Sequence, residues 1–192
     1  MSSPVAVAPF VVPPFVLVGG GARSGKSRFA LQRALSLSAG GVAVFVATAE
    51  PSDAEMRARI ADHRAERQGR LTTVEAPRDL PEAIDEIEGR VVILVDCLTL
   101  WLSNLLLDGV PARDVEARVD DLAAAVGRRR GPLVLVTNEV GMGLVPETPL
   151  GRVFRDVAGR AHQRLARDAD ELHVAIMGVV LRLRPEPIGI ER

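Results

Sequence analysis

The sequence predicts an α/β fold in which helices cover a mainly parallel sheet, and three features of the chain point to it. Short apolar runs with strand character alternate with longer segments of helical periodicity. The clearest runs, at residues 90–96 and 133–137, are apolar almost throughout, as in strands buried on both faces. A glycine-rich turn at residues 20–25 joins the first run to the first helical segment. Alternation of this kind is typical of one layered α/β domain.

The glycine-rich turn belongs to an eight-residue stretch that matches the phosphate-binding pattern GxxxxGK[ST] at every position. Its residues are Gly20, Gly21, Ala22, Arg23, Ser24, Gly25, Lys26 and Ser27. The glycines let the backbone curl so that N–H groups face phosphate oxygens, and the helix start adds partial positive charge. Lys26 is expected to reach the β- and γ-phosphates, and the Ser27 hydroxyl to hold Mg²⁺. The stretch therefore predicts a P-loop NTPase.

The use of lysine supports this interpretation. Lysine and arginine together number 24, and Lys26 is the only lysine among them. The lysine ammonium group is compact, whereas the arginine guanidinium group is planar and forked. The use of lysine at this one position therefore indicates that a compact ammonium group is needed there. Chance agreement with the pattern is disfavoured because the preceding strand, the following helix and the lone lysine all agree with it.

The other elements follow from the same periodicities. Further strands are expected at 15–18, 42–46 and 72–76, in addition to the two runs above. Helices are expected at 27–37, 53–67, 81–88, 98–107, 114–130 and 151–166. Ser52 and Glu55 form a capping box that opens the helix from residue 53. Two strands at 172–177 and 179–183, separated by Gly178, predict a C-terminal antiparallel hairpin.

The strand at residues 90–96 ends in Asp96, which predicts the second half of a P-loop site. Asp96 is expected to help Ser27 hold Mg²⁺. Many buried strands end in aspartate, so the prediction depends on the phosphate-binding loop. The strand at 133–137 leads into a polar, glycine-broken turn at the same sheet edge, where α/β folds place ligands.

Composition narrows the class of protein. A chain of 192 residues with 47% hydrophobic residues is long enough for one domain, expected at residues 15–192 behind a disordered extension at 1–14. A net charge of −1 disfavours a nucleic-acid surface. No run is long enough for a membrane span, and the proline-broken start lacks the features of a secretory signal. Cys97 is the only cysteine, which favours a reducing compartment and thus the cytoplasm.

The three histidines have different surroundings. His173 is expected to be structural or exposed, and His162 to lie on a helix surface beside an apolar stripe. His63 has arginines within one turn, among them Arg64 and Arg67. That cluster fits either a solvated helix face or a site for polyphosphate oxygens, where neighbouring cations keep the imidazole neutral and nucleophilic. Four acidic residues near loop or helix ends fit either ligands or caps: Asp53, Glu55, Glu75 and Glu139.

Several of these blocks together resemble one enzyme family over nearly the whole chain, from Val16 to Leu183. The first three are residues 19–28, Ala47-Thr48-Ala49 and His63-Arg64-Ala65-Glu66-Arg67. The others are Asp96-Cys97-Leu98-Thr99, Thr137-Asn138-Glu139-Val140-Gly141-Met142-Gly143, Val145-Pro146-Glu147, Phe154-Arg155-Asp156 and Ala158-Gly159-Arg160. The family is the bifunctional adenosylcobinamide kinase and adenosylcobinamide-phosphate guanylyltransferase of cobalamin biosynthesis. The block that begins at Asn138 and the block that begins at Phe154 are far more specific than the phosphate-binding loop.

The resemblance implies a RecA-like P-loop fold and two successive reactions. A nucleoside triphosphate, ATP or GTP, would phosphorylate the aminopropanol hydroxyl of adenosylcobinamide. GTP would then give its GMP to a histidine, matched here by His63, and the phosphorylated corrinoid would take it. The resemblance implies nucleotide contacts at residues 20–27, at Ala47, Thr48 and Ala49, at Arg64, Ala65, Glu66 and Arg67, and at Glu75 and Asp96. It also implies a homotrimer.

Three positions depart from the family pattern, and two other functions stay open. The family often has an acidic residue at Leu31, Trp at Leu71 and Asn at His162. None of these lies in the phosphate-binding loop or at His63 or Asp96. The alternatives are a P-loop kinase of another small metabolite, which would form no covalent nucleotide adduct, and a RecA-like ATPase module that acts through partners.

Overall fold

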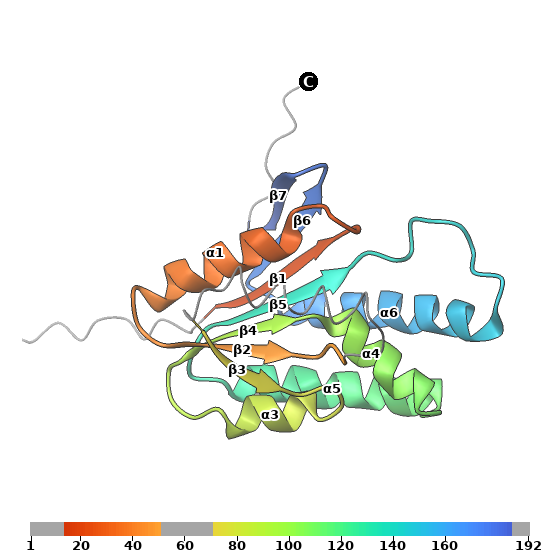
Figure 1. Ribbon diagram of the computed structural model, residues 1–192, viewed down its shortest axis with the longest axis horizontal. Coiled ribbons are helices and arrows are strands. Elements are labelled where there is room, and N and C mark those ends of the chain that lie inside the picture. The colour runs from red at the N-terminus through yellow and green to blue at the C-terminus, as the bar shows by residue number, and fades with distance from the viewer. Residues whose placement is uncertain (1–13, 51–70, 186–192) are drawn as a thin grey trace, which may run out of the picture.

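The computed structural model describes residues 14–50 and 71–185 (Figure 1). The expected helix at 53–67 and nearly all of the expected extension at 1–14 lie outside these ranges. The strands are β1 (Phe15–Gly20), β2 (Ala43–Ala47), β3 (Thr72–Glu75), β4 (Val92–Asp96), β5 (Leu133–Asn138), β6 (Glu171–Ile176) and β7 (Val179–Arg184). The helices are α1 (Lys26–Ser38), α3 (Leu80–Glu86), α4 (Leu98–Leu107), α5 (Ala112–Arg128) and α6 (Pro149–Asp168).

The described strands form one sheet in the order β3-β2-β4-β5-β1-β6-β7. All neighbours run parallel except β6 and β7, which form the C-terminal antiparallel hairpin. The prediction of an α/β fold with a mainly parallel sheet and this hairpin is therefore confirmed. The strand order places β1 between β5 and β6, so β1 lies inside the sheet although it comes first in the chain.

Each inner strand contributes alternate residues to two cores. In β1, Leu17 packs with the helices α3 to α6, whereas Val16 and Val18 pack toward α1. The strands are therefore apolar on both faces, which is why their sequences lack an alternating polar pattern. Trp101 of α4 is fully buried in the larger core.

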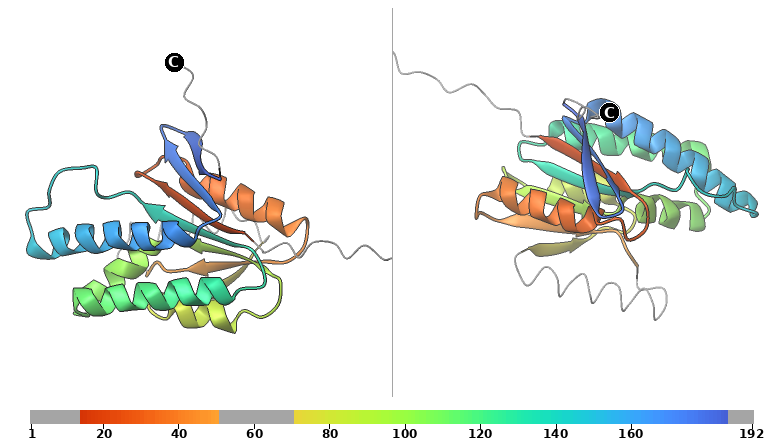
Figure 2. Two further views of the ribbon diagram at one scale, coloured as in Figure 1. Left: turned by 180° about the vertical axis from the view of Figure 1, so that it is seen from behind. Right: turned by 90° about the horizontal axis from the view of Figure 1, so that it is seen from above.

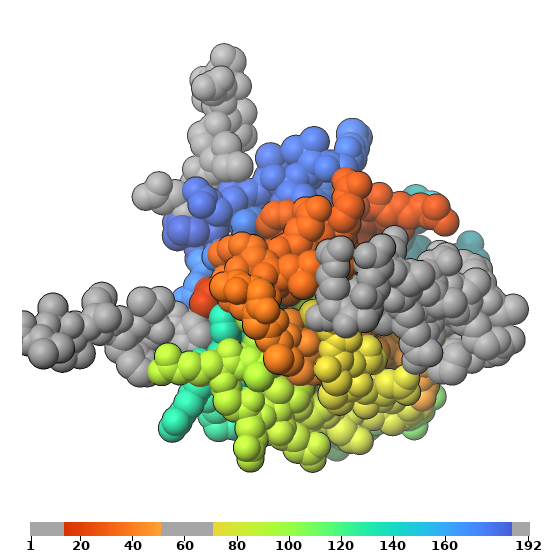
Figure 3. Space-filling view, turned by 60° about the vertical axis from the view of Figure 1, so that its left-hand side comes forward, coloured from red at the N-terminus to blue at the C-terminus, as the bar shows by residue number. Residues whose placement is uncertain are grey.

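The helices form two unequal layers. Among the described helices, α1 alone covers one face of the sheet, while α3, α4, α5 and α6 cover the other (Figure 2). Figure 3 shows the α1 side, where α1 adjoins the β6–β7 hairpin. The apolar stripe of α5, formed by Val115, Val119, Leu122 and Val126 at helical spacing, is buried against the sheet. Thr148 caps α6 by accepting a hydrogen bond from the Gly151 N–H, and Pro149 occupies the first turn.

No helix in the described part of the chain is both long enough and apolar enough to cross a membrane.

Candidate nucleotide-binding site

The carboxyl ends of the six parallel strands, β1 to β6, lie at one edge of the sheet, and the described residues of the predicted site lie there (Figure 1). Register pairing sets Gly20 beside Asn138, and Ala47 beside both Asp96 and Glu75. The phosphate-binding loop follows β1 and opens α1 at this edge. The structure thus brings the loop, Ala47, Thr48, Glu75 and Asp96 to one edge of the sheet. The segment from His63 to Arg67 lies outside the described residues.

The backbone of the loop requires glycine at two positions for different reasons. Gly25 has φ 93°, which is in the left-handed region that favours glycine. A Cβ on Gly20 would lie 2.6 Å from the Ala175 carbonyl oxygen and from Ser24 Oγ, so no side chain fits there. The hairpin turn supports the loop from outside, because the Gly178 N–H donates to the Ser24 carbonyl at 3.1 Å. This contact joins two turns that are far apart in the sequence, so no local pattern indicates it.

Lys26 is largely buried although it carries a charge. Its side chain is 7% exposed, and Nζ donates to the Gly21 carbonyl at 3.0 Å, so it folds back over the loop. Burial lowers the pKa of Lys26, and the nearby charge of Asp96 acts in the opposite direction. The charge of Asp96 therefore acts on Lys26 at the start of α1.

Ser24 adds an unusual feature to the loop. Its hydroxyl oxygen is buried and has no hydrogen-bond partner among the described residues. Native proteins pair nearly all buried polar groups, so an exception calls for a physical reason. An oxygen atom of a bound phosphate would supply the missing acceptor, since a hydroxyl donates readily.

The turn after β4 is hydrogen-bonded to β2 through Thr48. The Thr48 hydroxyl donates to the Cys97 carbonyl and accepts from the Cys97 N–H, both at 2.8 Å. The Thr48 N–H points to the Asp96 carbonyl at 3.5 Å. The Asp96–Cys97 peptide bond at this turn is cis. Thr48 itself is fully buried.

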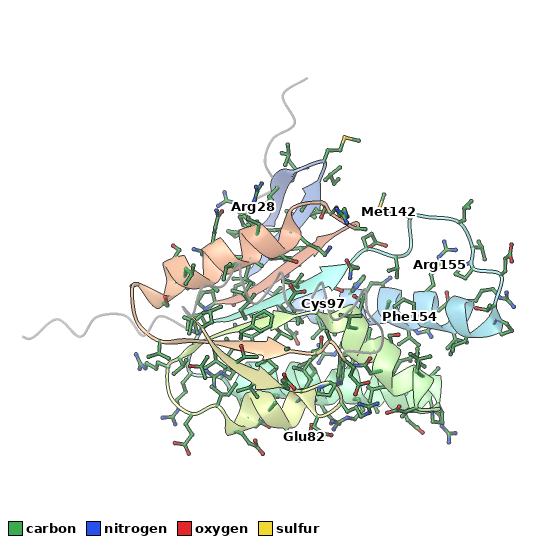
Figure 4. All side chains as sticks on the ribbon, viewed as in Figure 1. Arg28, Glu82, Cys97, Met142, Phe154 and Arg155 are labelled. Carbon is green, nitrogen blue, oxygen red and sulfur yellow. The ribbon has the colours of Figure 1, made fainter. Side chains whose placement is uncertain are left out.

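The same turn is also bound from β5. Asn138 Nδ2 donates to Thr99 Oγ1 at 2.9 Å and approaches Cys97 Sγ at 3.6 Å. Cys97 lies near the centre of the site edge in Figure 4. Burial, reinforced by the charge of Asp96, raises the pKa of the Cys97 thiol to about 11, so the thiol stays protonated at neutral pH.

His162 is not on the helix surface, and that prediction was wrong. Its side chain is 16% exposed, with Nε2 2.7 Å from Thr137 Oγ1 and Nδ1 3.7 Å from Glu139 Oε2. The loop after β5 covers this part of α6, which the periodicity of α6 alone does not reveal. Burial lowers the pKa of His162 against the opposing charge of Glu139. His173 was expected to be either structural or exposed, and it is structural. It is buried, contacts Glu171 and packs on the Phe29 ring.

Glu139 organises the glycine-rich turn that follows β5. Its N–H donates to the Gly20 carbonyl at 3.0 Å, and its carboxylate accepts from the Gly141 N–H at 2.6 Å. Arg155 of α6 donates to the Gly141 carbonyl at 2.8 Å and lies below this loop in Figure 4. The Glu139 carboxylate therefore caps this turn by accepting a backbone hydrogen bond. The turn joins the two blocks on which the family resemblance is most specific.

The residues present are suited to Mg²⁺. The Ser27 hydroxyl and the Asp96 carboxylate offer hard oxygen atoms at the same edge. The described residues include no group of three or more His, Cys, Asp or Glu that could hold a metal ion without other ligands. Such a site fits Mg²⁺, which usually keeps one or two protein ligands and completes its shell with phosphates and water.

Comparison with known proteins points to the same family as the sequence motifs. Residues 16–183 match the family model described as cobinamide kinase / cobinamide phosphate guanyltransferase. The chain is 40% identical over 173 residues to the bifunctional adenosylcobalamin biosynthesis protein CobP of Pseudomonas aeruginosa, covering 90% of this chain and 98% of that protein. It is 41% identical over 182 residues to CobU of Escherichia coli, which carries the same description, covering 88% of this chain and 99% of that protein.

Similar solved structures include the ATPase domain of G40P, with 13% identity and a TM-score of 0.47, covering 84% of this chain and 68% of that chain. A KaiC-like protein from Pyrococcus horikoshii has 16% identity and a TM-score of 0.46, covering 84% of this chain and 70% of that chain. The family match, by contrast, extends over nearly every described element, including both blocks around the β5–α6 loop. This chain belongs to the cobinamide kinase / cobinamide phosphate guanyltransferase family.

Proposed function

We propose that this chain phosphorylates adenosylcobinamide and then transfers GMP from GTP to the product, forming adenosylcobinamide-GDP and pyrophosphate. The observation that carries the proposal is the placement of buried Lys26 beside Asp96 at a phosphate-binding loop, in a chain that matches this family almost end to end. The relatives described above are bifunctional, and the chain covers 98 and 99% of their lengths.

In the kinase step, the aminopropanol hydroxyl of the corrinoid attacks the γ-phosphorus of ATP or GTP. The bond between the γ-phosphorus and the bridging oxygen breaks, and the nucleoside diphosphate leaves. Lys26 and the loop N–H groups stabilise the charge that develops on the phosphate oxygens. The Ser24 hydroxyl, which lacks a partner among the described residues, donates to a phosphate oxygen in the same cradle.

In the transferase step, an imidazole nitrogen of His63 attacks the α-phosphorus of GTP. Pyrophosphate leaves as the P–O bond breaks, and a P–N bond joins GMP to the protein. A phosphate oxygen of adenosylcobinamide phosphate then attacks the same phosphorus, which breaks the P–N bond and frees His63. A covalent intermediate divides one difficult transfer into two easier ones. Arg64 and Arg67 balance phosphate charge beside His63, and Ala47, Ala49, Ala65, Glu66 and Glu75 complete the proposed nucleotide contacts.

Mg²⁺ is part of the proposal, with Ser27 and Asp96 as its protein ligands. When bound, it would neutralise charge on the triphosphate and orient the phosphates for in-line attack. The hydroxyl and carboxylate suit this hard cation, as described above.

The test is incubation with GTP labelled at the α-phosphorus, followed by denaturing electrophoresis. We expect labelled protein whose label is lost in acid and kept in alkali, as for a phosphoramidate. His63→Ala should abolish labelling and GMP transfer, while phosphorylation of adenosylcobinamide continues. The chain offers two matched controls, because His162→Ala and His173→Ala remove its only other histidines.

Label on the His63→Ala protein, or GMP located by mass spectrometry on another residue, would disprove the covalent role of His63. ATP-dependent phosphorylation of another metabolite, without any labelled protein, would favour the alternative of a simple P-loop kinase.

We also propose a homotrimer that works in the cytoplasm, where both nucleoside triphosphates are available. The apolar edge of the β6–β7 hairpin supports assembly, since Val179, Leu181 and Leu183 are exposed. An edge strand with exposed apolar side chains is a natural surface for contact with another chain. Light scattering coupled to size-exclusion chromatography should give three times the chain mass, and a monomer would reject the assembly.

A further inference from the structure

We propose that Thr48 is a positioning residue that sets the direction of the Asp96 carboxylate, and that its hydroxyl does not contact the nucleotide. The inference rests on the proposed function, because it takes Asp96 as the carboxylate that faces Mg²⁺ and the triphosphate. The family resemblance suggests only a nucleotide contact at Thr48, and the inference gives its side chain a different role.

The first argument is that every polar atom of Thr48 is already engaged within the protein. The hydroxyl uses its proton on the Cys97 carbonyl and a lone pair on the Cys97 N–H. The Thr48 N–H faces the Asp96 carbonyl, and the Thr48 carbonyl accepts from Asn104 Nδ2 at 2.9 Å. A side chain with 0% exposure and two short hydrogen bonds has neither the access nor the proton to bind a phosphate.

The second argument is that these bonds act on the residue next to Asp96. Thr48 holds both the N–H and the carbonyl of Cys97, so it restricts rotation about both backbone bonds there. The Cys97 nitrogen also belongs to the peptide that carries the Asp96 carbonyl. A shift of this peptide would turn the Asp96 side chain at the end of β4.

The third argument is that the turn is bound from both neighbouring strands. Thr48 follows β2, and Asn138 at the end of β5 donates to Thr99 and approaches Cys97 Sγ from the other side. The strands β2 and β5 flank β4 in the sheet. The carboxylate therefore extends from a backbone segment held on two sides, and its charge acts on Lys26 at the start of α1.

Groups that orient a metal ligand through hydrogen bonds commonly change metal affinity by about 10- to 100-fold when they are removed. Loss of the Thr48 hydroxyl should therefore reduce the contribution of Mg²⁺ to nucleotide binding more than nucleotide binding without metal. A hydroxyl that contacted phosphate directly would produce the opposite pattern, with weaker binding in the presence and absence of Mg²⁺ alike.

The test compares the Kd of a fluorescent GTP analogue in Mg²⁺ with its Kd in a chelator, for the full-length protein. We expect Thr48→Val to reduce the Mg²⁺-dependent gain in affinity by about tenfold and to change metal-free binding by less than about twofold. Thr48→Ser keeps the hydroxyl and should restore the gain. Thr48→Ala removes the hydroxyl without adding bulk, so it tests the same expectation if the valine variant does not fold.

Thr137→Val is the matched control. Thr137 is also a buried threonine, and it lies near the end of the inner strand β5. Its hydroxyl contacts His162 and not the turn after β4. It should lose stability in thermal unfolding, as should Thr48→Val, yet keep the wild-type gain from Mg²⁺. An equal loss of the Mg²⁺ gain in Thr137→Val would show a general effect of core damage and overturn the inference.

The variant Asp96→Asn separates the inference from the proposed function. If it abolishes the Mg²⁺ gain while Thr48→Ala and Thr48→Val leave the gain unchanged, the positioning role is wrong and the metal role of Asp96 stands. If Asp96→Asn keeps the full gain, the proposed metal site is wrong and the inference falls with it. Failure of Thr48→Ser to restore the gain would assign the effect to packing of the methyl group and would also overturn the inference.

Discussion

The edge of the sheet that carries the phosphate-binding loop and the outer surface of α3, α5 and α6 use polar residues in opposite ways. At the edge, Thr48, Thr99 and Lys26 are buried. Thr48 and Lys26 bond to backbone groups, and Thr99 bonds to the side chains of Cys97 and Asn138. On the outer surface, arginines pair with carboxylates of neighbouring helices in solvent. These pairs are Arg118–Glu82, Arg128–Asp85, Arg160–Glu116 and Arg164–Asp120.

This difference indicates where single substitutions will change the free energy of unfolding most. Removal of one partner from a buried hydrogen bond leaves an unsatisfied group, at a cost of about 1–3 kcal/mol. An exposed ion pair contributes about 0–1 kcal/mol, because water competes for both charges. The arginine-rich composition therefore says little about stability, whereas the few buried polar groups of the edge control both structure and chemistry.

The largest expected effect is that of Lys26→Ala. The substitution removes the buried charge from the loop, so both reactions should fall by several powers of ten, as is usual for lost electrostatic stabilisation of a transition state. Rates of corrinoid phosphorylation and of GMP transfer provide the measurement. Arg113→Ala, which removes a highly exposed cation from α5, should leave both rates unchanged. Full activity of a folded Lys26→Ala protein would contradict the loop assignment.

The next effect is that of Asp96→Asn, which keeps the shape of the side chain and removes its charge. We expect the Mg²⁺ concentration for half-maximal kinase activity to rise about tenfold or more, because a carboxylate ligand is lost. Titration of activity with Mg²⁺ at saturating nucleotide measures it. An unchanged titration curve would remove Asp96 from the metal site.

A smaller effect concerns the pH dependence of stability at His162. Burial lowers the pKa of His162 below its ordinary value of 6.5, so the unfolded chain takes up a proton first as the pH falls. Its contribution to stability is therefore complete above about pH 6.5 and declines as the pH falls toward the lowered folded-state pKa. His162→Gln retains hydrogen-bonding capacity without titrating, and should flatten this part of the curve.

Denaturant unfolding of wild type and His162→Gln from pH 8 to pH 5 provides the measurement for this prediction. The two curves should diverge only below about pH 6.5. Identical slopes below that pH would show that His162 does not titrate differently in the folded protein.

The smallest effect is expected on the outer surface. A double-mutant cycle with Arg118→Gln and Glu82→Gln should give a coupling free energy of about 0.2–1 kcal/mol, even though the two side chains approach to 2.6 Å. The free energy of unfolding in denaturant measures it, and added salt should weaken it. A coupling of several kcal/mol would show that this surface is as important as the edge.

Much of the fold could be predicted because local signals agree with it. Every described strand and helix lies where apolar runs and helical periodicity place it, and α4 spans residues 98–107 as expected. The order of strands in the sheet could not be predicted in this way, since it depends on how distant segments pack. The placement of β1 between β5 and β6 is one such feature.

The site was predictable to a similar degree. The loop, Asp96 and Glu75 meet at one edge because parallel strands end there. His162 was assigned to the helix surface because it lies beside the apolar stripe of α6, and only the loop from β5 reveals its burial. The double hydrogen bond of Thr48 with Cys97 joins residues 49 positions apart, so no local pattern could indicate it.

The buried position of Lys26 has a practical consequence. It is the only lysine of the chain, so a reagent that acylates amines has one side-chain target, in addition to the α-amino group of the chain. That target is shielded by the loop and hydrogen-bonded to Gly21. The rate of acylation of Lys26 thus reports on a single atom at the centre of the site, and mass spectrometry of the peptide that contains it measures that rate without isotopes or engineered labels.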